Sequence, residues 1–298
     1  MPTLLDFRRR IRSVKNSQQI TRAMKFVAAA RLRRAQEAAL AARPYAWELA
    51  RVLRSTMARI QEPQHPLLQR REEKAILVIV LSGERGLAGP FNTNILRKAN
   101  EFFRAHRGKK LVTIPVGKKG RDALRKAGFT FAGEWVNVLS RVEFKTAREI
   151  AGLATEIYAD AKVDSVYIIF SEFKSVMTAN LTVDKLLPVE AVLEDKPKEL
   201  PAVDKPREQP VAQVDYIYEQ PESQLLDKLL PRYVETQILR AMLESSASEY
   251  AARMTAMESA TKNAGEVIDA LTLHMNKVRQ AAITKEIIEI VSGAAHGT

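Results

Sequence analysis

The feature that most restricts the fold is the length of the helical pattern at the C-terminal end of the chain. A helical pattern runs from about Pro221 to Val291; Pro231 can lie near its start, and after that only Gly265 interrupts it. Apolar residues from Met254 to Ile290 recur at intervals of three, four or seven. Roughly sixty to seventy helical residues would extend about 90–105 Å, at about 1.5 Å per residue. That exceeds any globular core that a chain of 298 residues can build. The pattern therefore predicts a helix that needs a partner helix along much of its length.

The N-terminal end of the chain is the obvious partner. Residues 3 to about 60 have a helical period, and Thr3 and Asp6 approximate a capping box at their start. Pro44 removes a backbone donor and should kink or split this helix. We therefore predict an antiparallel coiled coil formed by the two ends of the chain. The apolar stripe of its first helix consists of Leu4, Phe7, Ile11 and Val14, continued by Ile20, Met24 and Val27.

The middle of the chain changes period. Short apolar runs rich in branched residues, typical of buried strands, occupy 75–81, 110–116 and 165–171. Amphipathic stretches, typical of helices, occupy 93–106, 119–128 and 146–161. Strands that alternate with helices predict a parallel α/β sheet, to which 176–190 adds one or two further strands.

The predicted fold class is α/β plus coiled coil. An antiparallel coiled coil of the N- and C-terminal helices carries an inserted Rossmann-like α/β domain. The predicted divisions are an N-terminal coiled-coil helix at 1–70, an α/β domain at 71–220 with a Pro-rich loop near 194–210, and a C-terminal coiled-coil helix at 221–298.

Composition excludes several classes of function. The chain has no cysteine, which rules out disulfides and cysteine-based sites, and its four histidines are not spaced as metal ligands. No apolar run approaches the roughly 20 residues that span a bilayer. The N-terminus is rich in arginine, as organelle transit peptides are, but it already fits the first helix. We predict no catalytic residue, no metal and no cofactor.

Positive charge predicts acidic partners. The formal net charge is +12, which suits nucleic acid, an anionic membrane surface or an acidic protein face. A run of one sign along the first helix favours an acidic counter-surface, although a solvated face is the default interpretation of charge runs. This run comprises Arg8, Arg9, Arg10, Arg12, Lys15, Arg22, Lys25, Arg31, Arg33 and Arg34.

Two glycine-rich turns follow predicted strands, at 81–95 and at 116–122. Such turns can cradle phosphate with backbone N–H groups. Neither turn matches the P-loop or the dinucleotide fingerprint, and the Lys-Ser/Thr pair of the P-loop is missing. We therefore interpret them as tight turns or surface contacts rather than nucleotide sites.

Several stretches together resemble one family. QQITRAMKFVAAARLRRAQ (18–36), LSGERGLAGPFNTN (81–94) and the segment 257–295 resemble signatures of the gamma subunit of F-type ATP synthase, the central-stalk rotor of F1. The segment 214–235 is also similar to that family, so the resemblance covers nearly the whole chain. The chain differs from it at Glu84, Ala88 and Pro90, where the family often has Asp, Cys and Gly.

The resemblance implies a function and a set of partners. The chain would be a non-catalytic rotor shaft inside a ring of three α and three β subunits, which carry out the chemistry. Proton flow would turn the ring of c subunits, and the chain would turn with it and with the ε subunit. Its place would be peripheral, at the cytoplasmic face of a bacterial inner membrane. A bacterial origin is expected because the recognisable helix begins almost at residue 1.

The resemblance also assigns residues. The expected contacts with β subunits are made by Met24, Lys25, Arg85, Gly86, Leu87, Ala88, Arg279 and Gln280. The expected apolar bearing at the C-terminal tip consists of Ile283, Ile287, Ile288, Ile290 and Val291. The expected foot against the c-ring and ε consists of Tyr216, Tyr218 and Glu219.

Two other functions compete with this interpretation. A basic coiled-coil adaptor would bind nucleic acid with steeply salt-dependent affinity. An α/β enzyme with a helical dimerisation arm would need a substrate or nucleotide pocket. Both leave the detailed C-terminal resemblance unexplained, and we therefore expect no nucleic-acid partner.

Overall fold

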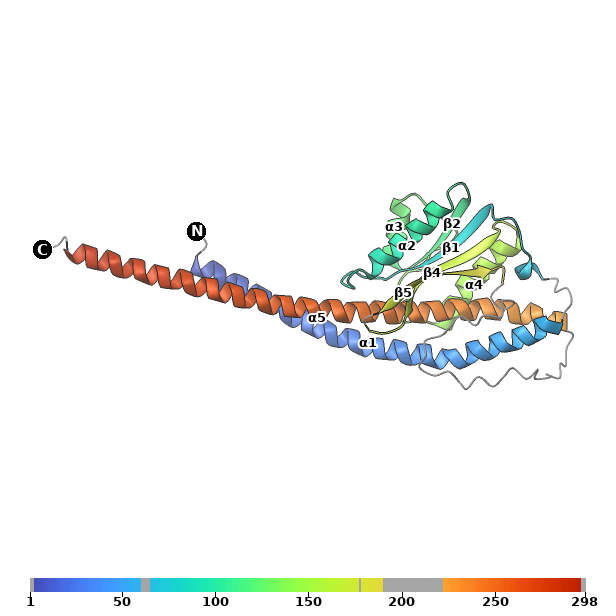
Figure 1. The fold of residues 1–298 in the computed structure, drawn as a ribbon, viewed down its shortest axis with the longest axis horizontal. Helices are drawn as coiled ribbons and strands as arrows, with labels where there is room; N and C mark the ends of the chain where they lie inside the picture. Colours follow the sequence, from blue (N-terminus) through green and yellow to red (C-terminus); the bar gives the residue numbers. More distant parts are fainter. Residues whose placement is uncertain (1–2, 60–64, 177, 190–221, 296–298) are drawn as a thin grey trace. The chain divides into compact units, whose positions relative to one another are not determined.

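The computed structural model describes residues 3–59, 65–176, 178–189 and 222–295. The chain forms two compact units, to each of which α1 (Leu4–Arg59) and α5 (Glu222–Ala295) contribute (Figure 1). The terminal unit consists of Met1–Ala29 and Arg253–Thr298, and the α/β unit consists of Ala30–Ala252. In both units the N-terminal helix packs against the C-terminal one, as the sequence predicts. The expected foot residues and the loop at 194–210 lie outside the described residues.

The sheet of the α/β unit has five strands in the order β3-β2-β1-β4-β5. Four of them, β1 (Ala75–Leu81), β2 (Lys110–Val116), β3 (Thr130–Phe131) and β4 (Ser165–Phe173), run parallel. The fifth, β5 (Ala179–Leu187), is antiparallel to β4, a direction that the sequence prediction left open. The connection from Phe173 to Ala179 is too short for the helical crossover that a parallel strand requires.

Helices cover both faces of the sheet. Ile76, Val78 and Val80 of β1 pack with buried residues of α2 (Phe91–Ala105) and α3 (Lys118–Lys126). The alternate residues of β1 join a second core with α4 (Phe144–Ala159), α1 and α5. All six residues from Ile76 to Leu81 are 0% exposed, which explains why this strand reads as a continuous apolar run. A short 3-10 helix, η1 (Pro66–Leu68), precedes β1.

The first helix starts at a capping box and contains an interior proline. Thr3 and Asp6 form the predicted capping box: Thr3 N–H donates to Asp6 Oδ2 at 2.9 Å, and Asp6 N–H donates to Thr3 Oγ1 at 3.3 Å. These hydrogen bonds hold the pKa of Asp6 below its usual range. The helix continues through Pro44, so of the two predicted effects of this proline, a kink or a split, the split is wrong. Leu49 and Leu53, which follow the proline, are buried in the core and hold this part of the helix in place.

Candidate functional site

The terminal unit is an antiparallel helix pair. Phe7 stacks on His274 with ring centroids 5.0 Å apart, Thr21 shares a hydrogen bond of 2.8 Å with Thr261, and Lys25 forms an ion pair with Glu258. Rising residue numbers in α1 thus meet falling numbers in α5. This register places the first turn of α1 opposite the region of Lys277, so the last turns of α5 extend beyond the start of its partner helix.

The seam of this pair is partly polar. The less exposed positions of α1 follow spacings of three and four through Leu4, Phe7, Ile11 and Val14, and then continue through Gln18, Thr21 and Lys25. Ile20 and Val27 are 60% and 54% exposed, so their predicted place in the apolar stripe is wrong. Both lie two residues from a seam position, on another side of the helix. Gln18 Nε2 instead donates to the Thr261 carbonyl at 3.3 Å.

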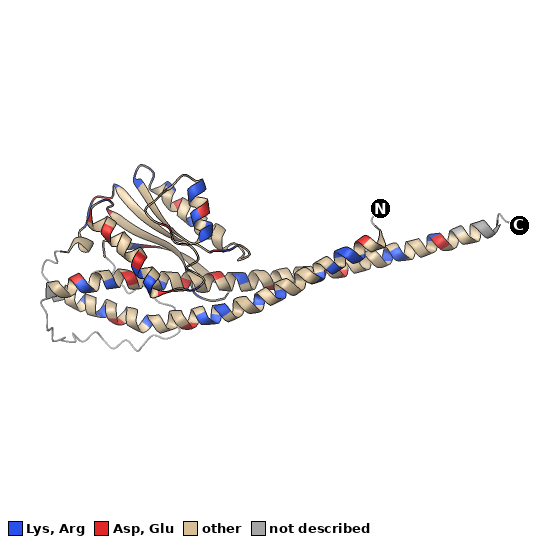
Figure 2. Ribbon diagram, turned by 180° about the vertical axis from the view of Figure 1, so that it is seen from behind, with Lys and Arg blue, Asp and Glu red and all other residues tan. Residues whose placement is uncertain are grey.

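Basic residues recur along α1 in the terminal unit (Figure 2). Six of the predicted cations in this unit are exposed: Arg8, Arg9, Arg10, Arg12, Lys15 and Arg22. Lys25 is one-third exposed and forms the ion pair with Glu258, whereas Met24 is half-buried. The only acidic residue of α1 in this unit is Asp6, and its carboxylate is engaged in the capping box. The surface can attract an anionic partner.

The C-terminal end of α5 is apolar and exposed. The expected bearing residues are 48–72% exposed: Ile283, Ile287, Ile288, Ile290 and Val291. Arg279 and Gln280, one turn earlier, are exposed as well. Large aliphatic side chains gathered at one helix end lose contact with water only when a partner covers them. This is the surface of the terminal unit that most clearly calls for a partner.

The expected contact turn at Arg85–Ala88 lies in the α/β unit. Arg85, Gly86 and Leu87 are exposed, and Leu87 has a φ of 63° that turns the chain sharply. Ala88 is 1% exposed, because its methyl group packs in the core beneath α2. A partner can therefore meet the side chains of Arg85 and Leu87 at this turn, but only the backbone of Ala88.

The two glycine-rich turns bind each other rather than an anion. The Glu84 carboxylate accepts hydrogen bonds from the N–H of Lys118 at 3.0 Å and from the N–H of Val138 at 3.1 Å. Ser82 Oγ accepts the N–H of Gly120 at 2.7 Å. A Cβ on Gly117, whose φ is +102°, would lie 1.9 Å from the Ser82 carbonyl oxygen. Because these N–H groups already have protein partners, the turns serve as a structural joint between β1 and α3.

Sequence reasoning missed the polar anchors of α5. Every residue from Ala241 to Ala251 is buried, including three serines and two glutamates. Ser246 Oγ donates to the Leu139 carbonyl at 2.9 Å, and Ser248 Oγ donates to the Ser171 carbonyl at 3.1 Å. The signal was present as the run ESSASEY, small and polar residues in a helix that is otherwise alanine-rich and aliphatic. These two bonds hold this part of α5 against β4 and against the loop that contains Leu139.

Neither a candidate metal centre nor a membrane-spanning helix is present among the described residues. Residues 3–59, 65–176, 178–189 and 222–295 contain no group of three or more His, Asp or Glu side chains that could hold a metal ion. Over the same ranges, no helix has an apolar stretch long enough to cross a membrane.

Comparisons with known proteins agree over the whole length. A family model described as ATP synthase matches residues 3–296. The ATP synthase gamma chain of Solibacter usitatus (strain Ellin6076) is 49% identical over 299 residues, 99% of each chain. That of Pelotomaculum thermopropionicum is 45% identical over 295 residues, again 99% of each. A chain of the Euglena gracilis mitochondrial ATP synthase rotor has a TM-score of 0.65 at 19% identity, covering 94% of this chain and 98% of that one, and supports the fold alone.

Proposed function

The chain belongs to the ATP synthase gamma chain family, and we propose that it is the rotor shaft of that complex and has no catalytic site of its own. The observation that carries the proposal is the exposed apolar end of α5 in a chain that matches gamma chains over its whole length. A rotor shaft needs such an end, seated in other subunits. The shaft couples proton-driven rotation of the c-ring to ATP synthesis or hydrolysis at β subunits.

The tip acts as a bearing. Burial of apolar surface is favourable without being directional, so aliphatic side chains can turn inside an apolar sleeve without breaking specific hydrogen bonds. Each of the five exposed side chains contributes on the order of 1 kcal/mol when a sleeve covers it, because about half or more of its surface is still in contact with water. The sleeve is formed by the ring of three α and three β subunits.

Polar contacts lower on the shaft grip the ring. Arg279 and Gln280 meet a loop of a β subunit. Met24, Lys25 and the turn of Arg85, Gly86, Leu87 and Ala88 approach an acidic β-subunit segment. The exposed cations of α1 support this choice of partner, since opposite charges attract across an interface and steer its assembly. Such contacts weaken with salt, so they can form and release during a turn.

The α/β unit holds the shaft at the membrane end of the complex. Tyr216, Tyr218 and Glu219 form the foot against the c-ring and the ε subunit, and the chain is peripheral at the cytoplasmic face of a bacterial inner membrane. The division at 1–70, 71–220 and 221–298 remains a prediction. The hydrogen bonds of Ser246 and Ser248 support this role, because torque passes through a helix only where the helix cannot slip.

Reconstitution tests the proposal. Purified α and β subunits are mixed with and without the full chain, and complex formation and ATP hydrolysis are measured. We expect one copy of the chain in a complex with three α and three β subunits that hydrolyses ATP, and no hydrolysis by the chain alone. Failure to join the ring, together with retardation of DNA in a gel at moderate salt, would instead favour the nucleic-acid adaptor.

A further inference from the structure

The segment that contains α2, β2 and α3 is strongly basic. Residues 91–128 contain eleven Lys and Arg against two Asp and Glu, a net charge of +9 in a chain whose total is +12. Because α2 and α3 pack on the same face of the sheet, cations of both helices lie on one side of the α/β unit (Figure 2). Eight of them are exposed, and together they form what we call the α2–α3 surface: Arg97, Arg104, Arg107, Lys110, Lys118, Lys119, Arg125 and Lys126.

Most cations of the α2–α3 surface have no acidic partner. Arg125 forms an ion pair with Glu134, and Arg97 Nη2 donates to Asn94 Oδ1 at 3.2 Å. The other six form no ion pair with any residue that the structure describes: Arg104, Arg107, Lys110, Lys118, Lys119 and Lys126.

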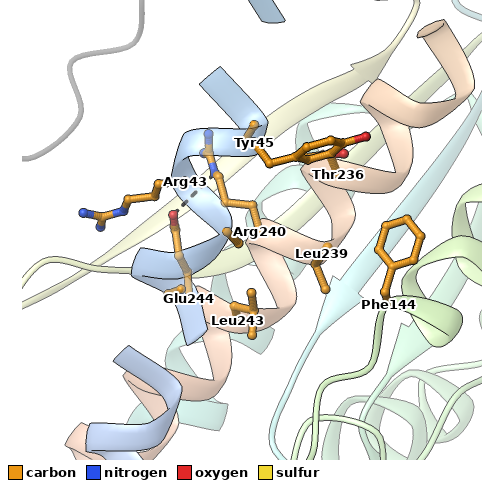
Figure 3. Close-up of a pocket in the computed structure, with 11 residues that line it drawn as sticks. Arg43, Tyr45, Phe144, Thr236, Leu239, Arg240, Leu243 and Glu244 are labelled. Atoms are coloured by element: carbon orange, nitrogen blue, oxygen red, sulfur yellow. Dashed lines mark ion pairs between the residues drawn. The ribbon is translucent and has the colours of Figure 1, made fainter. Parts of the chain in front are cut away.

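On the other face of the sheet, cations are matched by acids. Arg240 of α5 forms an ion pair with Glu244 at 3.4 Å (Figure 3), and Arg148 of α4 forms one with Glu235 at 3.8 Å. The helix α4 carries two cations and two acids and therefore has no net charge. Among the three helices that connect the strands, the excess of positive charge is confined to α2 and α3.

Helix dipoles explain only part of this pattern. Arg104 lies in the last turn of α2, and Arg125 and Lys126 lie in the last turn of α3, where a cation is favourable. Lys118 and Lys119 lie in the first turn of α3, where a cation is unfavourable, and no acidic residue offsets them in that turn. A local stability rule broken in this way is expected at a functional surface.

The composition of the α2–α3 surface selects the kind of anionic partner. Protein interfaces are enriched in aromatic residues and depleted in lysine, whereas four of the six unpaired cations are lysines. Binding of single strands of nucleic acid uses exposed aromatic rings, and no large apolar or aromatic side chain is exposed within 91–128, all of which the structure describes. A layer of anionic lipid headgroups requires neither, because flexible side chains with point charges can follow its phosphates.

We propose that the α2–α3 surface binds the anionic lipid headgroups of the membrane beside the complex. The proposal rests on the proposed function, which places the α/β unit at the membrane end of the shaft. Each cation near such a membrane surface strengthens binding about fivefold. The contact is electrostatic and without insertion, since the surface exposes no large apolar side chain. Lipids are fluid, so a contact of this kind can slide while the shaft turns.

Flotation of the full chain with vesicles tests the proposal. The vesicles consist of phosphatidylcholine alone or contain about one-third phosphatidylglycerol, and the bound fraction is measured. We expect at least about tenfold tighter binding to the anionic vesicles, lost when salt rises from about 0.1 M to about 0.5 M. The neutral vesicles report insertion of the apolar tip of α5. Equal binding to both kinds of vesicle would overturn the proposal.

A pair of double variants locates the contact. Lys118→Gln with Lys119→Gln should weaken binding to anionic vesicles at least about tenfold, and the chain should still fold because cations are lost from a helix N-terminus. Lys145→Gln with Arg54→Gln removes the same charge from exposed positions of α4 and α1 and should weaken binding less than about threefold. Circular dichroism checks that both variants fold.

Two results with these variants would contradict the membrane contact. Equal losses in both would show that only net charge matters. A larger loss of affinity for a DNA duplex than for anionic vesicles, in the Lys118 and Lys119 variant, would identify nucleic acid as the partner. Reconstitution with α and β subunits needs no vesicles, so a failed flotation assay would remove the membrane contact and leave the rotor shaft in place.

Discussion

The same two helices behave differently in the two units. In the α/β unit, α5 is buried on all sides from Ala241 to Ala251 and is held by side-chain hydrogen bonds to loops and strands. In the terminal unit, its seam with α1 is partly polar, and its last turns expose five large aliphatic side chains. Directional bonds fix a helix in one orientation, whereas exposed apolar surface lets a partner surround it without choosing an orientation. One helix can thus be anchored in one unit and free to turn against a partner in the other.

Truncation of apolar side chains should give the largest contrast between the units. Leu53 is 0% exposed in the core of the α/β unit, and Leu53→Ala should cost about 2–5 kcal/mol of unfolding free energy. Ile287 is 56% exposed, and Ile287→Ala should change the stability of the isolated chain by less than about 0.5 kcal/mol. Urea denaturation of the isolated chain measures both. A comparable loss in Ile287→Ala would mean that the tip already packs within the chain.

A buried carboxyl should make the α/β unit sensitive to pH. Burial raises the pKa of Glu244 to about 7, above its value in the unfolded chain. Folding then favours the protonated form, so the free energy of unfolding falls as the pH rises from about 4.5 to 7. Glu244→Gln should remove this dependence and be more stable than the parent by about 2–3 kcal/mol at pH 8, with little difference at pH 4.

The terminal unit supplies the control for this titration. Glu258 is 60% exposed and pairs with Lys25, so Glu258→Gln should change stability by less than about 1 kcal/mol. Denaturation is followed between pH 4 and pH 8 for the parent and both variants. A stability gap for Glu244→Gln that stays constant across this range would show that folding leaves the pKa of Glu244 unchanged.

Loss of a serine hydrogen bond in α5 should give the next largest change in the free energy of unfolding. Ser246→Ala leaves the buried Leu139 carbonyl without its partner and should cost about 1–2 kcal/mol. Thr284 Oγ1 bonds the Gln280 carbonyl on an exposed turn of the terminal unit, and Thr284→Ala should stay within about 0.5 kcal/mol. Thermal melting compares the loss of stability in Ser246→Ala with that in Thr284→Ala. Equal losses would remove the distinction between an anchored and a free segment of α5.

Changes to the hydrogen bond between Thr21 and Thr261, in the contact of the two terminal helices, should have the smallest effect on stability. Thr21→Val alone leaves the Thr261 hydroxyl without this partner and should cost up to about 1 kcal/mol. The double variant Thr21→Val and Thr261→Val replaces both partners and should be neutral or slightly more stable. Melting curves of the parent, of Thr21→Val, of Thr261→Val and of the double variant form a double-mutant cycle. A loss in the double variant equal to the sum of the two single losses would show that the pair contributes nothing.

Local sequence patterns predicted where helices and strands lie better than they predicted which segments those elements contact. The strands at 75–81 and 110–116 are correct to the residue, because each mainly apolar run follows a lysine and ends at a glycine-rich turn. The direction of β5 and the seam positions Gln18 and Thr21 were not predictable in this way. Both depend on which partner segment packs against the chain at that point. Apolar residues such as Ile20 and Val27 are then assigned to the helix contact from sequence, although the register leaves them exposed.

Some features of the candidate site could likewise be predicted from sequence, and others required the fold. The apolar tip and the basic helix could be read from the sequence, because runs of one residue type need no tertiary information. The serine anchors and the buried Glu244 could not, since polar residues in a helix usually face water and only the fold shows which are buried. The contacts expected at Arg279, Gln280 and the foot residues stay predictions.

Rotation of the chain inside the assembled ring tests the central claim most directly. The sequence contains no cysteine, so Lys126→Cys, at the exposed end of α3, gives one attachment point for a bead in the α/β unit. The ring of α and β subunits is immobilised and ATP is added. The account predicts unidirectional, stepwise rotation of the bead. A bead that stays still while the same complexes hydrolyse ATP would contradict the assignment of this chain as a shaft.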